Sequence, residues 1–150
     1  MSDLNELYQE IILDHNKHPR NCRSLGDANH HAEGYNPLCG DKVTIYLKVK
    51  DGMIDEISFE GSGCAISTAS ASLMTEALKG KSLEEAARMF ESFHGVVTGK
   101  PGAVLQENDS LKLAVFHGVS DYPIRVKCAT LPWHTLQAAL ANKVDQVTTE

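Results

Sequence analysis

A strand, a tight turn and a returning strand, all readable between residues 42 and 60, constrain the fold of this chain more than any other feature. Polar and apolar residues alternate strictly from Lys42 to Lys50, as in a strand with one buried face. Asp51-Gly52 follows, a pair that favours the type I′ turn of a two-residue hairpin. Residues Met53 to Glu60 then place apolar side chains on one face again. We therefore predict an antiparallel hairpin as the basis of a small sheet.

Helical patterns surround this hairpin. A first helix is expected to end at about Lys17, before Pro19, and a short edge strand is expected near His30 to Tyr35. The remaining expectations are a helix over Cys64 to Lys79, a helix from a Ser82 cap to about Phe93, a loop over Gly95 to Asn108, a helix over Asp109 to Val119, and helix from Tyr122 to Ala141 with a break at Pro132. Strands followed by helices indicate an α+β fold with helices on one face of an antiparallel sheet. Its expected core includes Leu47, Phe59, Ile66 and Leu136.

Length and composition indicate an ordinary globular domain. A chain of 150 residues can form one domain, 1–150, that buries about two thirds of its unfolded surface, and 42% hydrophobic with 23% charged residues is typical of such domains. The formal net charge of −6 argues against a nucleic-acid partner. No apolar stretch approaches the roughly 20 residues of a membrane span, and no signal peptide is evident. We therefore expect a cytoplasmic protein, in which four cysteines indicate metal binding or catalysis before disulfides.

Three cysteines and one aspartate form the candidate site. Cys39 and Asp41 precede the outgoing strand of the hairpin and Cys64 follows the returning strand, so antiparallel pairing brings them to one end of the sheet. Cys64 also falls at an expected helix N-terminus, where the pKa of a thiol is lowered. Cys128 would have to arrive from the C-terminal helices, which the spacing does not establish.

Several kinds of chemistry fit this set. Three thiolates and a carboxylate can complete a tetrahedral zinc shell, and the more labile oxygen ligand favours a site that opens. The same side chains also suit a [2Fe–2S] cluster. A structural zinc module without chemistry is a third hypothesis, and unrelated buried cysteines are a fourth. A thiol oxidoreductase is disfavoured because the chain has no CxxC pair.

Four blocks of residues carry a family resemblance. They are Asp14-His-Asn-Lys-His-Pro-Arg-Asn21, Asn36-Pro-Leu-Cys-Gly-Asp41, Gly61-Ser-Gly-Cys-Ala-Ile-Ser67 and Arg125-Val-Lys-Cys-Ala-Thr-Leu-Pro-Trp133. With them the chain resembles the U-type iron–sulfur cluster assembly proteins, in particular their SufU branch, over nearly its whole length. Lys127 stands where the IscU scaffold branch has a histidine, and the Leu-Pro-Pro-Val-Lys chaperone-docking motif of that branch is absent.

The resemblance implies an α+β fold and a zinc ion bound by four side chains, Cys39, Asp41, Cys64 and Cys128. It also implies a partner, a SufS-type cysteine desulfurase, which supplies a ligand to the zinc. Cys39 is thereby freed as the nucleophile that accepts persulfide sulfur and passes it on to the cluster-assembly machinery. The implied alternative is a scaffold for a [2Fe–2S] cluster.

The charge of such a centre predicts supporting residues. Zinc with three thiolates and one carboxylate sums to −2, which a partly buried site tolerates only with favourable neighbours. Arg125 and Lys127, beside Cys128 in the sequence, are the candidate cations.

Overall fold

The computed structural model describes residues 3–37, 40–99, 116, 119, 122–141 and 147–148. Its helices are α1 (Asp3–Lys17), α2 (Ala65–Leu78), α3 (Leu83–Val97) and α4 (Pro123–Leu140), and its strands are β1 (His30–Asn36), β2 (Asp41–Lys50), β3 (Met53–Ser62) and β4 (Val147–Thr148). The predicted first helix, edge strand, hairpin and Cys64 helix are all present. Of the helix expected over Asp109 to Val119, only Phe116 and Val119 are among the described residues, so the prediction lies largely outside them.

The sheet is built around the predicted hairpin. Its strand order is β3-β2-β1-β4, and β2 pairs antiparallel with both β3 and β1. Asp51 and Gly52 have φ of 54° and 74°, the positive values that a type I′ turn requires. The short β4 pairs parallel with β1 and was not predicted from the sequence. The α+β class and the antiparallel three-stranded unit are confirmed.

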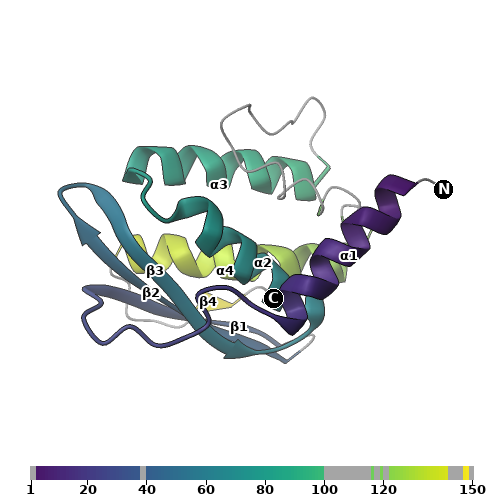
Figure 1. Cartoon of the computed structure of the whole chain (residues 1–150), viewed down its shortest axis with the longest axis horizontal. Helices are drawn as coiled ribbons and strands as arrows, with labels where there is room; N and C mark the ends of the chain where they lie inside the picture. Colours follow the sequence, from purple (N-terminus) through teal and green to yellow (C-terminus); the bar gives the residue numbers. More distant parts are fainter. Residues whose placement is uncertain are drawn as a thin grey trace.

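Helices cover one face of this sheet. α2 and α4 pack against the strands and against each other, and α1 lies along α2. In Figure 1, α3 lies farther from the sheet and contacts α4. Leu47, Phe59 and Leu136 are buried in the core as predicted, whereas Ile66 is only partly buried against it. Burial of this apolar face is the main source of stability for the layers.

A glycine brings α4 close to the sheet. A Cβ placed on Gly34 in β1 would collide with Oγ1 of Thr135 and would lie 3.0 Å from Cδ1 of Leu131, both in α4. The absence of that Cβ allows helix and strand to approach directly. α4 also carries Cys128, so this packing helps to set where the last cysteine lies.

The N-terminal ends of α2 and α3 are each capped by the side chain of the residue that precedes the helix. Cys64 precedes α2 with extended backbone angles, and its sulfur accepts from the Ser67 amide. Ser82 caps α3 in a reciprocal capping box with Glu85, with contacts of 3.1 Å in both directions. α3 continues to Val97, so the predicted end at about Phe93 and the predicted loop start at Gly95 are wrong by about one turn. Gly95 to Val97 are buried there, and that packing outweighs the low helix propensity of glycine.

The expected break at Pro132 is also wrong, because α4 runs through that residue. Proline removes one helical hydrogen bond and crowds the preceding turn. In the turn before Pro132, the Ser70 hydroxyl of α2 donates to the Ala129 carbonyl and so ties α4 to α2. Buried neighbours, including Trp133 stacked on Phe93 with ring centroids 4.6 Å apart, hold the helix together on both sides. Within the described ranges, no helix combines the length and hydropathy of a membrane span.

Candidate metal centre

Asp41 lies at the end of the sheet where β1 turns into β2. It is the first residue of β2, pairs with Asn36 at the end of β1, and is fully buried. Gly40 precedes it with φ of 73°, a left-handed conformation that favours glycine, and its amide donates to the Asn36 carbonyl at 2.8 Å. The carboxylate is therefore fixed by a tight turn at the sheet end predicted for it.

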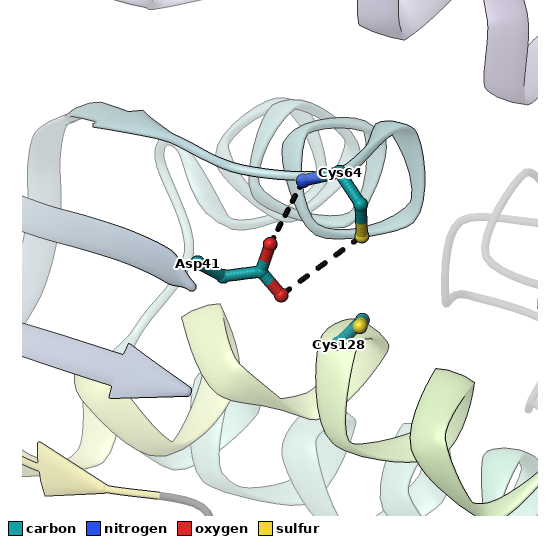
Figure 2. A group of neighbouring side chains, drawn as sticks. All are labelled: Asp41, Cys64 and Cys128. Atoms are coloured by element: carbon teal, nitrogen blue, oxygen red, sulfur yellow. Dashed lines mark hydrogen bonds between the residues drawn. The ribbon is translucent and has the colours of Figure 1, made fainter. Parts of the chain in front are cut away.

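Cys64 reaches the same end of the sheet, because it follows the C-terminal end of β3. β3 pairs with β2 up to Lys42 and Ser62, which leaves Gly63 and Cys64 beside Asp41. The Cys64 amide donates to Oδ1 of Asp41 at 2.8 Å, and the Cys64 sulfur lies 3.9 Å from Oδ2 (Figure 2). A Cβ on Gly63 would collide with Oδ1 and lie 3.0 Å from Cγ of Asp41, so the carboxylate needs glycine there.

Cys128 completes the described group from α4. It is 2% exposed, and its sulfur accepts from Nδ2 of Asn36 at 3.6 Å. One ligand atom each from Asp41, Cys64 and Cys128 can be chosen so that all lie within 4.8 Å of one another. Figure 2 shows the two sulfurs and the carboxylate facing a common space between β2, the start of α2 and α4. The long-range approach of Cys128, left open by the sequence, is thus established.

This donor set fits zinc. Two thiols and one carboxylate from three separate segments converge, and sulfur with a single oxygen is a ligand combination that zinc accepts in tetrahedral sites. Cys39, the fourth predicted ligand and the predicted nucleophile, lies outside the described residues. Its place in the centre stays a prediction.

The Cys64 thiol is shifted toward its reactive form. A hydrogen bond with Cys128 lowers the pKa of Cys64 to about 7 from an ordinary 9.0, partial burial opposes the shift, and the Ser67 amide adds to it. A thiol with that pKa is about half thiolate at neutral pH, the form that binds metals and attacks sulfur.

The predicted supporting cations lie at the edge of this arrangement. Arg125 is exposed, with its guanidinium 4.7 Å from the ring centre of Tyr122, and Lys127 is partly buried. Among the described residues, no ion pair joins either cation to Asp41. Their role as supporting charges stays a prediction. The fourth cysteine, Cys22, is exposed and is not part of the described donor group.

The sequence profile of the NifU-like N-terminal domain matches residues 7–142, which is most of the chain. The chain belongs to this family. Family membership confirms the resemblance drawn from the four sequence blocks, and the NifU-like fold agrees with the α+β arrangement. It makes the chain an iron–sulfur cluster assembly protein of the SufU and IscU type.

Three relatives illustrate what this NifU-like chain is similar to. The zinc-dependent sulfurtransferase SufU of Bacillus subtilis is 39% identical over 145 residues, 95% of both chains. The iron–sulfur cluster assembly scaffold protein IscU of Streptococcus pyogenes is 39% identical over 145 residues, 97% of this chain and 89% of its own. A crystal structure from Fervidobacterium islandicum, provisionally assigned as a cluster assembly scaffold protein for the SUF system, superposes with a TM-score of 0.82 at 38% identity, covering 91% of this chain and 98% of that one.

Asn36 was not among the predicted site residues, yet it contacts two of the three candidate ligands, Asp41 and Cys128. Its amide nitrogen lies 3.3 Å from Oδ2 of Asp41 and 3.6 Å from the Cys128 sulfur. The sequence could have indicated Asn36, because a short turn between two antiparallel strands places the last residue of the first strand opposite the first residue of the second, here Asp41.

Proposed function

We propose that this chain is a zinc-dependent sulfur-transfer protein that accepts sulfur from a SufS-type cysteine desulfurase and passes it to cluster assembly. The observation that carries the proposal is the convergence of Asp41, Cys64 and Cys128 within 4.8 Å, on a chain similar to SufU over 95% of its length. We also propose that the chain acts as a single domain in the cytoplasm, where its thiols stay reduced.

The residues that would hold zinc are Asp41, Cys64, Cys128 and, by resemblance, Cys39. When bound there, zinc would keep its thiol ligands deprotonated and shielded from oxidation. The chain would supply a preformed arrangement, since the carboxylate is tied to the Cys64 amide before any ion arrives. Arg125 and Lys127 would reduce the net charge of −2 from outside, by longer-range attraction.

The chemical step that we assign to this chain is a thiolate exchange at Cys39. The Cys39 thiolate attacks the terminal sulfur of the desulfurase's cysteine persulfide. A sulfur–sulfur bond forms at Cys39, the bond in the desulfurase breaks, and the desulfurase cysteine leaves as a thiolate. No external oxidant or reductant is needed, because the sulfane sulfur moves between two thiols.

The test is a single-turnover transfer from a SufS-type desulfurase carrying one persulfide. Intact-mass and peptide mass spectrometry should find one added sulfur atom on Cys39. In a separate assay with excess cysteine, the turnover of the desulfurase should increase when the chain is present. Cys39→Ala should abolish both results, and Cys22→Ala is the matched cysteine control that should preserve them. Persulfide that stays on the desulfurase at all protein ratios would contradict the proposal.

A second candidate is a scaffold on which a [2Fe–2S] cluster is built. It is favoured by the Streptococcus pyogenes relative named as a scaffold, whose identity of 39% equals that of the SufU relative. The same thiol and carboxylate ligands can hold the irons of such a cluster. Anaerobic reconstitution with iron and sulfide separates the two functions, because a stable cluster at one per chain is expected only of the scaffold.

A further inference from the structure

Asn36 is a buried amide at the centre of the candidate site. It is fully buried and ends β1, where it pairs directly with Asp41 of β2. Residues paired across two antiparallel strands place their side chains on the same face of the sheet. The side chain of Asn36 is thus directed by strand register toward the metal ligands rather than by a flexible loop.

The amide nitrogen of Asn36 donates to two ligands at once. It lies 3.3 Å from Oδ2 of Asp41 and 3.6 Å from the sulfur of Cys128. An asparagine amide has two N–H groups, which matches one donor to each acceptor. The opposite orientation of the amide would set its carbonyl oxygen against a carboxylate, so the orientation with nitrogen toward the ligands follows from the chemistry.

These contacts join ligands that come from distant parts of the chain. Asp41 begins β2 and Cys128 lies in α4, and the amide of Asn36 bridges them inside the protein. Hydrogen bonds to ionised acceptors are the strong ones, and groups that hold metal ligands in this way raise metal affinity. Arg125, one of the two cations predicted from the sequence, is exposed instead, and Lys127, the other, is only partly buried.

We propose that Asn36 is a positioning residue of the metal centre, whose two amide hydrogens hold the Asp41 carboxylate and the Cys128 sulfur for the same ion. Donation to Cys128 also withdraws electron density from that sulfur. Cys128 therefore donates less charge to the metal and is a poorer nucleophile. The inference rests on the proposed function only in requiring that the centre binds a metal; it does not depend on sulfur transfer.

Two variants test the proposal without relying on activity. Asn36→Leu keeps roughly the volume of the side chain and Asn36→Ala reduces it, but both remove the two donors. Zinc affinity, measured by competition with a chromophoric chelator, should fall about 10- to 100-fold in both. In the Co²⁺-substituted proteins, the sulfur-to-cobalt charge-transfer band should move to lower energy in both, because the sulfur of Cys128 has lost a hydrogen bond.

Asn29→Ala is the matched control. The side chain of Asn29 also forms two hydrogen bonds, both with the backbone of Val49 at 2.8 Å. It lies just before β1, at the opposite end of that strand from Asn36. Its loss should lower thermal stability while leaving zinc affinity and the cobalt band unchanged. Zinc affinity within about threefold of the unaltered protein and an unmoved band in both Asn36 variants would overturn the proposal.

A measurement on the unaltered protein covers the case in which both variants fail to fold. With ¹¹³Cd²⁺ in place of zinc, a side-chain amide proton of Asn36 should show scalar coupling to cadmium through the Cys128 sulfur. Two sharp Asn36 amide protons without that coupling would overturn the proposal. A protein that takes up no Cd²⁺, Co²⁺ or Zn²⁺ would instead refute the metal centre itself, and with it both this inference and the zinc-dependent function.

Discussion

At the scale of single residues, the candidate centre depends on a backbone position that no side chain can occupy. A Cβ on Gly63 would collide with the Asp41 carboxylate. Gly63→Ala should therefore displace that ligand and lower zinc affinity at least about tenfold. Gly26→Ala is the control, because a Cβ there meets nothing within 4 Å. Equal zinc affinity in the two variants would show that Asp41 is not held as described.

The thiol of Cys64 gives a second prediction at this scale. Its pKa is lowered to about 7, so in the metal-free protein its alkylation rate should rise with pH around that value. Cys128→Ala removes the largest cause of the shift and should move the midpoint upward, toward 9. Iodoacetamide labelling followed by peptide mass spectrometry measures the rate at each cysteine. Burial and Glu60 raise the pKa of Cys22, which provides an internal reference.

The same shift has a consequence for stability, with a definite sign. A thiol whose pKa is lower in the folded state stabilises the fold above its unfolded pKa, and this contribution is lost as pH falls through the folded value. The metal-free protein should therefore gain stability from Cys64 between about pH 7 and pH 9. Cys64→Ala should flatten that part of a denaturation profile; a profile unchanged by the substitution would contradict the shift.

At the scale of elements, the cap of α3 should contribute to the stability of the fold without affecting metal binding. Ser82 and Glu85 form a capping box at α3, which lies away from the described ligands. Ser82→Ala should cost about 1 kcal/mol of stability and leave zinc affinity unchanged. Urea denaturation of the metal-free protein, together with chelator competition, checks both parts. A change in metal affinity would mean that α3 is coupled to the site.

The elements also show what the sequence could predict and why. The strict alternation before Asp51-Gly52 determines the hairpin, because both the buried face and the turn are local properties. The same register placed Asp41 and Cys64 at one sheet end. The predicted break at Pro132 is wrong because α4 packs against α2 and against Phe93, which lie far away in sequence, and this packing outweighs the tendency of proline to break a helix. Cys128 and β4 depend on such long-range packing as well, so local patterns did not establish their places.

At the scale of the whole molecule, the core is complete without a metal. Large buried side chains come from the sheet and from α2, α3 and α4, so we expect the chain to fold without the metal. Removing zinc with a chelator should lower the thermal midpoint by roughly 10 °C and keep the circular dichroism spectrum. Added zinc should restore the midpoint. Complete unfolding on chelation would favour a structural zinc module over a sulfur-transfer protein.

We propose that Asp41, Cys39, Cys64 and Cys128 together hold one zinc ion. X-ray absorption spectroscopy of the zinc-loaded chain tests it most directly. We expect three sulfur ligands at about 2.3 Å and one oxygen ligand at about 2.0 to 2.2 Å, with the oxygen lost or replaced in Asp41→Ala. A shell made mainly of nitrogen and oxygen, or one unchanged in Asp41→Ala, would contradict it.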